Sequence, residues 1–269
     1  MAISPDQTYA AITNYGDDKP GSTISIVNIV EHTVEKVINI APFRRPHGIE
    51  WFSDGRRLIV SAEAQRSVII VDVQTGTVAT SIRTGQEGSH MVKLSQDEER
   101  VYVPNIGSGT LSVLDISEEY IIKTIPTHQG TEGITLTGNG AELWVTNRAA
   151  NTISIINTDS LNVTNTLQSR SFPIRAETSP NGQWVAVSNA QSSEVAIFNA
   201  HTQQRITTIS TETEKEENGV PIGLIFSTDS NHLYVANSEA DHIVVIDTGN
   251  WEIVDRFPTG KTPDGIAYF

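Results

Sequence analysis

The sequence predicts an all-β fold, a β-propeller built from four-stranded blades. A turn signal of the Ser-Pro-Asp-Gly type recurs along the whole chain. The Asp or Asn of successive turns is spaced by 48, 43, 42, 42 and 48 residues, at Asp6, Asp54, Asp97, Asn139, Asn181 and Asp229. A four-strand unit reiterated about every 40–50 residues is typical of a propeller blade, and a β-sandwich does not require such a repeat.

Three short runs of β-type residues follow each turn. The first run ends in Asn in five of its six copies, which are residues 11–14, 59–62, 102–105, 144–147, 186–189 and 234–237. The second ends in Asn28, Asp72, Asp115, Asn157, Asn199 or Asp247, and residues 152–157 show its period-two alternation. Residues 252–257 exemplify the last run. β-Branched and aromatic runs between Gly, Pro, Asn and Asp turns predict strands, and no comparable window has a helical period.

These motifs resemble the YVTN-repeat β-propellers over essentially the whole chain. Trp144-Val145-Thr146-Asn147 is the nearest match to the Tyr-Val-Thr-Asn strand, and Ala62 departs from its Asn. No Trp-Asp dipeptide ends a blade, which disfavours a WD-type propeller. The resemblance implies the haem-free, cytochrome-d1-like or lactonase-like propeller superfamily, bacterial or archaeal in type. Many such proteins are binding or surface proteins, and export to the periplasm or the extracellular space is common among them.

We expect residues 1–269 to form a single β-propeller domain with six visible repeats. Both residues 1–3 and residues 263–269 match parts of a first strand. In a six-bladed ring, Ile266–Phe269 would pair near Ala11–Asn14 and so cover an open sheet edge. In a seven-bladed parent lacking most of one blade, that edge would stay open. If a blade is missing, Met1 need not be the natural start of the chain. Residues 1–6 carry no secretion signal.

Composition excludes several classes of function. The 269 residues carry 32 acidic and 18 basic side chains, a net charge of −14, which argues against nucleic-acid binding and against docking on anionic lipid. The chain has no cysteine, so disulfides, thiolate metal sites and cysteine nucleophiles are excluded. No segment approaches the ~18 consecutive apolar residues of a membrane span.

Loop insertions indicate which edge of the blades binds a partner. Strands labelled A to D alternate in direction, so the D–A and B–C loops share one face. Two insertions fall on that face: residues 15–22 in a B–C loop and residues 211–219 in a D–A loop. Variable loops of repeat proteins usually carry the binding function. We therefore expect a small molecule or a protein partner on the D–A/B–C loop face.

One position of the A strand is unusually polar. The residue seven before each turn Asp or Asn should point toward the central channel. It is His47, His90, Glu132, Ile174 or Ile222, with Asp264 in the matching terminal segment. Arg175 follows one of these positions, and Arg44, Arg45 and His128 lie in adjoining loops. Convergent polar groups at a channel mouth predict a ligand-binding site made of these eight polar residues.

Three chemistries could use this set. His47, His90 and Glu132 are the ligand types of a divalent metal site, and such a metal would activate water or polarise a carbonyl. Arg44, Arg45 and Arg175 could instead hold a carboxylate or phosphate, because a guanidinium matches these groups bidentately. The histidines could also simply join neighbouring blade loops by hydrogen bonds. No catalytic residue can be assigned.

The sequence thus predicts a binding or interaction propeller that presents a loop face and a channel mouth to its partner. The alternative is a metal-assisted, lactonase-like hydrolase or lyase at the channel mouth. The family resemblance adds a non-covalent haem domain, with His47 or His90 as the axial ligand. The metal content of the purified protein distinguishes the binding propeller from the metal-assisted enzyme. An absorption spectrum tests for the haem domain.

Overall fold

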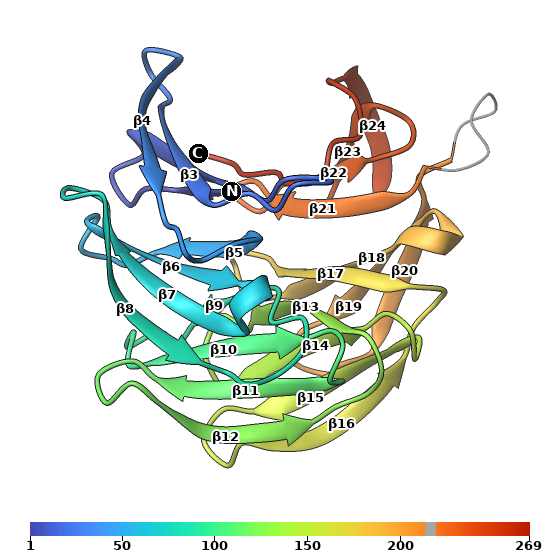
Figure 1. Ribbon diagram of the computed structural model, residues 1–269. Coiled ribbons are helices and arrows are strands. Elements are labelled where there is room, and N and C mark those ends of the chain that lie inside the picture. The colour runs from blue at the N-terminus through green and yellow to red at the C-terminus, as the bar shows by residue number, and fades with distance from the viewer. Residues whose placement is uncertain (213–218) are drawn as a thin grey trace. The chain divides into compact units, whose positions relative to one another are not determined.

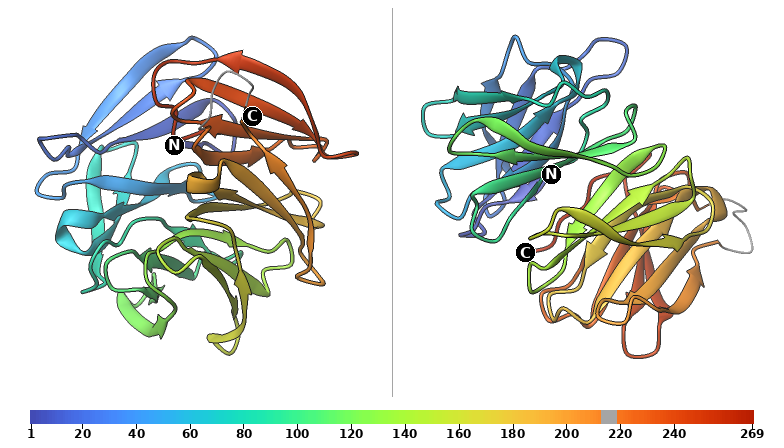
Figure 2. Two further views of the ribbon diagram at one scale, coloured as in Figure 1. Left: turned by 90° about the vertical axis from the view of Figure 1, so that its right-hand side faces the viewer. Right: turned by 90° about the horizontal axis from the view of Figure 1, so that it is seen from below.

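Six four-stranded antiparallel sheets, each with its strands in chain order, make up the computed structural model (Figure 1; two further views in Figure 2). The structure describes residues 1–212 and 219–269. The predicted fold class is confirmed: an all-β, six-bladed propeller with four-stranded antiparallel blades. Residues 1–126 and 127–269 form two compact units with three blades each. That residues 1–269 are one domain stays a prediction.

The first unit contains blades 1 to 3. Blade 1 consists of β1 (Ala2–Ile3), β2 (Tyr9–Asn14), β3 (Thr23–Asn28) and β4 (Thr33–Asn39). Blade 2 consists of β5 (Pro46–Trp51), β6 (Arg57–Ala62), β7 (Ser67–Asp72) and β8 (Thr77–Arg83), with the short 3₁₀ helix η1 (Glu63–Gln65) after β6. Blade 3 consists of β9 (Lys93–Leu94), β10 (Arg100–Asn105), β11 (Thr110–Asp115) and β12 (Tyr120–Pro126).

The second unit contains blades 4 to 6. Blade 4 consists of β13 (Thr131–Leu136), β14 (Glu142–Asn147), β15 (Thr152–Asn157) and β16 (Asn162–Gln168). Blade 5 consists of β17 (Pro173–Thr178), β18 (Trp184–Asn189), β19 (Glu194–Asn199) and β20 (Arg205–Ser210), with η2 (Ala190–Ser192) after β18. Blade 6 consists of β21 (Pro221–Phe226), β22 (His232–Asn237), β23 (His242–Asp247) and β24 (Glu252–Pro258).

The recurring turn signal has a clear hydrogen-bonding reason. In blade 5, the Ser179 hydroxyl donates to Asn181 Oδ1 at 2.7 Å, and Asn181 Oδ1 also accepts the Gln183 N–H at 3.0 Å. Ser179 Oγ in turn accepts the Trp184 N–H at 2.9 Å. Such side chain-to-backbone bonds close the turn locally and favour Ser followed two residues later by Asp or Asn. The turn chemistry therefore fixes where each hairpin begins.

The Thr and Asn of the Tyr-Val-Thr-Asn strand form hydrogen bonds that join neighbouring strands. Asn147 Nδ2 donates to Thr152 Oγ1 at 3.1 Å and to Ser154 Oγ at 3.0 Å, which ties β14 to β15. Thr146 Oγ1 accepts the Gly133 N–H at 2.8 Å and donates to the Ile174 carbonyl at 3.3 Å. The hydroxyl thus links the first strand of blade 4 to the first strand of blade 5.

A β-bulge shifts the first strand at the polar position predicted from the sequence. In blade 2, Pro46 pairs with Ala62 but Ile49 pairs with Val60, and blade 4 shows the same shift between Thr131 and Ile134. A Cβ on Gly133 would lie 2.5 Å from the Ile174 carbonyl oxygen, so only glycine allows the next first strand to approach this closely. Bulges re-aim side chains, here those of His47 and Glu132.

The predicted strand at Ile266–Phe269 does not form. Residues 259–269 contain no strand, and Ala10 and Ala11 pair with β1 instead. The segment packs on blade 6, where a Cβ on Gly223 would collide with the Asp264 carbonyl oxygen and the Tyr268 ring stacks on Tyr234 with centroids 5.3 Å apart. Its side chains follow the first-strand pattern, but no strand in residues 1–212 or 219–258 pairs with it through the ladder hydrogen bonds that a strand requires.

The fourth strand of each blade is its most exposed strand. The side chains of β14 are almost all buried, including Trp144, whereas β16 is mostly exposed. Apolar side chains of adjacent blades pack together, for example Ile24 and Ile26 with Leu58 and Val60 in the first unit. Among the described residues, no helix has the length and apolar character to cross a membrane.

Candidate functional site

The structure gathers most of the predicted site residues into two clusters, one within each unit. The histidine cluster contains Tyr15, Arg45, His47, Glu63 and His90. The arginine cluster contains Glu132, Arg148, Phe172, Arg175 and Asp264. Each cluster is built around a first-strand position, since His47 and Glu132 are the second residues of β5 and β13 and His90 precedes β9.

Two stacked imidazoles form the centre of the histidine cluster. The rings of His47 and His90 lie with centroids 3.6 Å apart and planes 26° from parallel. The ring of Tyr15 meets His47 edge-on, with centroids 5.6 Å apart. His90 is 9% exposed and His47 is half-buried. Blades 1, 2 and 3 therefore each supply one aromatic ring to the cluster.

Glu63 is the carboxylate that orders these rings. Its Oε2 lies 3.0 Å from His90 Nδ1 and accepts a 3.2 Å hydrogen bond from the Tyr15 hydroxyl. The hydrogen bond from His90, more than any other effect, holds the pKa of Glu63 below its ordinary value, although burial opposes this. Burial, followed by the negative charge of Glu63, raises the pKa of Tyr15. The cluster is thus a carboxylate–imidazole pair with an attached phenol, a set of groups that can orient and exchange protons.

The two neighbouring arginines behave differently from each other. The Arg45 guanidinium lies over the Tyr15 ring, 4.9 Å from its centroid, and donates from Nη2 to the Asp17 carbonyl at 3.1 Å. Arg44 is exposed, and its backbone N–H donates to Gln65 Oε1. Arg45 therefore joins the histidine cluster, and the structure gives no contact between the Arg44 side chain and it.

The arrangement of the two imidazoles does not suit a shared metal ion. A metal lies in the plane of each ligating imidazole, about 2.0–2.1 Å from the nitrogen. Nearly parallel rings stacked 3.6 Å apart do not direct two nitrogen lone pairs at one such point. Among residues 1–212 and 219–269, no group of three or more His, Asp or Glu side chains could hold a metal. Ligation of a metal by His47, His90 and Glu132 together stays a prediction.

The arginine cluster is organised around one buried carboxylate. Glu132 is 2% exposed. Its Oε1 lies 2.8 Å from Arg175 Nη1 and its Oε2 lies 2.5 Å from Arg148 Nη1. Arg148 also lies over the ring of Phe172, 5.1 Å from its centroid. A buried carboxylate with a guanidinium on each oxygen is compensated in charge, and it fixes both arginines in place.

Asp264 lies at the accessible side of this cluster. Its Oδ1 is 3.7 Å from Arg175 Nη2, and its side chain is 51% exposed. Without Asp264 the cluster carries one net positive charge, from two arginines and Glu132. His128 is exposed, and its carbonyl accepts the Thr131 hydroxyl, so the structure assigns its ring no role in the cluster. Convergence of both clusters at one channel mouth stays a prediction.

Tyr15, Glu63, Arg148 and Phe172 belong to the clusters but were not predicted as site residues. The first three each lie directly after the second strand of a blade, following Asn14, Ala62 and Asn147. The repeat could have indicated these residues. The position directly after the second strand is as constant in register as the first-strand position that it contacts. Of the predicted loop insertions, residues 15–22 contribute Tyr15 and Asp17, whereas most of residues 211–219 lies outside the described residues.

Comparison with known proteins identifies the architecture more closely than the activity. The model of a family described as lactonase, 7-bladed β-propeller, matches residues 120–219. No curated protein has a significantly matching sequence. A hydrazine synthase chain of Kuenenia stuttgartiensis superposes with a TM-score of 0.86 at 18% identity, covering 98% of this chain and 87% of that one. The β-propeller domain of Cps50 (Swd1) from Myceliophteria thermophila superposes with a TM-score of 0.83 at 13% identity, covering 99% and 87%. These likenesses show the propeller fold, and they are consistent with a lactonase-like or YVTN-type propeller.

Proposed function

We propose that this protein is a binding propeller that holds a small carboxylate-bearing ligand at the arginine cluster. The observation that carries the proposal is the pair of guanidinium groups clamped on buried Glu132. Their side chains are 13% exposed at Arg175 and 31% exposed at Arg148, so both remain reachable from outside. Planar guanidinium groups recognise carboxylates by paired hydrogen bonds.

The donors of these arginines exceed what the protein itself uses. In the described part of the chain, Arg148 makes one side-chain ion pair, through Nη1, and a contact with the face of Phe172. Arg175 uses Nη1 for Glu132 and the Ile174 carbonyl, while Nη2 is 3.7 Å from Asp264. A guanidinium has five N–H donors, so several remain for a ligand. Because Glu132 already fixes both groups, little side-chain entropy would be lost on binding.

Titration calorimetry with mono- and dicarboxylates, and with inorganic phosphate, tests the proposal. Arg175→Lys keeps the charge but removes the planar fork, so we expect carboxylate affinity to fall about tenfold, the effect of losing one charge-assisted bond. Arg205→Lys is the matched control, because Arg205 lies over Phe198 outside the cluster. Equal affinities of the two variants, or no binding by the unchanged protein, would contradict the proposal.

A lactonase-like hydrolase is the second candidate. It is favoured by the family-model match and by the Glu63–His90 pair. A carboxylate on imidazole Nδ1 is the arrangement that orients a histidine for general acid–base chemistry, and the attack of water on a lactone carbonyl requires such chemistry. Hydrolysis of a panel of lactones should then fall at least about a hundredfold in His90→Gln. The exposed His32→Gln should leave the rate unchanged, and a His90→Gln variant of full activity would reject this role.

A further inference from the structure

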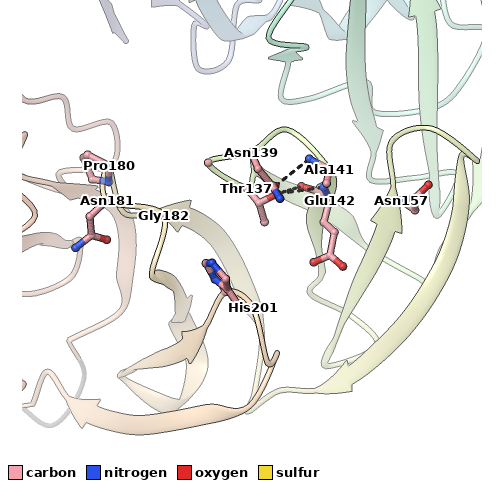
Figure 3. Close-up of a pocket in the computed structure, with 11 residues that line it drawn as sticks. Thr137, Asn139, Ala141, Glu142, Asn157, Pro180, Asn181, Gly182 and His201 are labelled. Atoms are coloured by element: carbon pink, nitrogen blue, oxygen red, sulfur yellow. Dashed lines mark hydrogen bonds between the residues drawn. The ribbon is translucent and has the colours of Figure 1, made fainter.

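A concave site lies at the edge of blades 4 and 5 where the A–B and C–D turns gather. The cavity has a volume of about 530 Å³, within the range of small-ligand pockets (Figure 3). Its walls come from the A–B turns of both blades and from residues at the ends of β15 and β19. Its polar lining residues include Asn139, Glu142, Asn157, Asn181 and His201.

Three asparagines of this pocket are held by their own turns. Asn139 Oδ1 accepts the Thr137 hydroxyl and the Ala141 N–H, and Asn181 Oδ1 is used in the same way in blade 5. Asn157 Oδ1 accepts the Ser160 N–H. Within the part of the chain that the structure describes, their amide nitrogens have no protein partner. The pocket therefore offers hydrogen-bond donors on oriented carboxamides, which suit carbonyl acceptors of a ligand.

Glu142 is positioned by a chain of side chains from both blades. Asn165 Nδ2 donates to Gln203 Oε1 at 2.7 Å, and Gln203 Nε2 donates to Glu142 Oε1 at 3.0 Å. This leaves Oε2 of Glu142 without a partner among the described residues. No Lys or Arg lines the pocket, so Glu142 gives it a net negative charge when His201 is neutral. A fixed carboxylate of this kind favours an ammonium or guanidinium group.

We infer that this pocket binds a basic amino-acid residue, either free or within a peptide. Its cationic group would pair with Glu142, and its backbone carbonyls would accept hydrogen bonds from the asparagine amides. In Figure 3, His201 lies between the Pro180–Gly182 turn and Glu142. The site is separate from the arginine cluster in residues and in ligand charge, so it does not depend on the proposed function.

The test is titration calorimetry with Nα-acetyl-arginine amide, with the binding site located by ¹⁵N NMR shifts. Glu142→Gln retains an acceptor for Gln203 but loses the charge, so affinity should fall about tenfold or more. Glu118→Gln removes the same charge from an exposed turn in blade 3 and should change nothing. The neutral citrulline analogue should bind the unchanged protein about as weakly as the arginine probe binds Glu142→Gln.

Arginine within an alanine-flanked peptide separates the two sources. Tighter binding of the peptide than of free L-arginine identifies a peptide partner, and tighter binding of free L-arginine identifies a free amino acid. In either case, NMR shifts should centre on Gly138 and Gly182. Equal binding of the arginine and citrulline probes, unchanged affinity in Glu142→Gln, or shifts elsewhere would overturn the inference.

Discussion

The histidine and arginine clusters use the same two positions of the repeat with their charges exchanged. In the histidine cluster, the basic groups His47 and His90 come from the first-strand position, and the carboxylate Glu63 follows a second strand. In the arginine cluster, the carboxylate Glu132 occupies the first-strand position, and Arg148 follows the second strand. The repeat therefore fixes which positions meet, while the residues placed there choose the chemistry.

The exchange also changes the chemistry that each cluster offers. Guanidinium groups present planar pairs of N–H donors that match a carboxylate. A carboxylate hydrogen-bonded to imidazole Nδ1 orients the ring for proton transfer. The first arrangement suits holding an anion, and the second suits moving a proton.

Glu132→Gln should cause the largest loss of stability. It leaves Arg148 and Arg175 without their shared counter-charge, and breaking a buried pair costs about 3–5 kcal/mol. We expect about 3 kcal/mol, at the low end of that range, because Arg148 is 31% exposed. Urea unfolding measures the effect, and exposed Glu118→Gln should stay within about 0.5 kcal/mol of the unchanged protein. A similar small change for Glu132→Gln would show that the arginines are not held by this carboxylate.

Glu63→Gln should cost less at neutral pH, about 1–2 kcal/mol, because a hydrogen-bonded carboxylate that is 26% exposed is replaced by an amide. The lowered pKa of Glu63 means that its charged form stabilises the fold above the ordinary value of 4.5. That contribution is lost as the pH falls through the lower, folded-state pKa. Unfolding followed from pH 6 down to about pH 3 should therefore show a shallower decline in the variant than in the unchanged protein. Parallel curves would refute the role of the Glu63–His90 bond.

The same variant should lower the pKa of Tyr15 only part of the way toward its ordinary value of 10.0. The negative charge of Glu63 is removed, but burial, which is the larger cause, remains. A raised pKa means that the stability from Tyr15 is present below pH 10.0 and is lost as the pH rises through the folded-state pKa. Alkaline absorbance titration, with Tyr15→Phe as the blank, measures it. An unchanged Tyr15 pKa in Glu63→Gln would show that the charge of Glu63 does not act on the Tyr15 hydroxyl.

Asp264→Asn should have the smallest effect on stability, within about 0.5 kcal/mol, because Asp264 is a half-exposed partner at 3.7 Å. Its effect on binding should have the opposite sign from that of Arg175→Lys. Removing a carboxylate that competes for Arg175 should tighten carboxylate binding a few-fold in the calorimetric assay. Weaker binding would mean that Asp264 helps to form the site instead of competing with its ligand.

Much of the fold could be predicted because its signals are local. The Ser179–Asn181 turn closes through bonds between residues at most five apart, and the alternation in 152–157 needs only the strand itself. The failure at Ile266–Phe269 shows the limit. Its side-chain pattern matches a first strand, yet a strand exists only where a neighbour pairs with it, and that neighbour is not encoded in the segment.

The repeat, the strand order within each blade and the polar first-strand position of His47, His90 and Glu132 could all be predicted from the amino-acid sequence. Constant spacing is enough for this, because equivalent residues of a repeat take equivalent places. Which charged groups pair depends on the packing of the folded chain. Glu63 reaches His90 across 27 residues, and Arg175 reaches Glu132 across 43. These pairs form between neighbouring blades, where packing at the bulge brings one first strand against the next. A local sequence pattern does not indicate which residue of the next blade will be the partner.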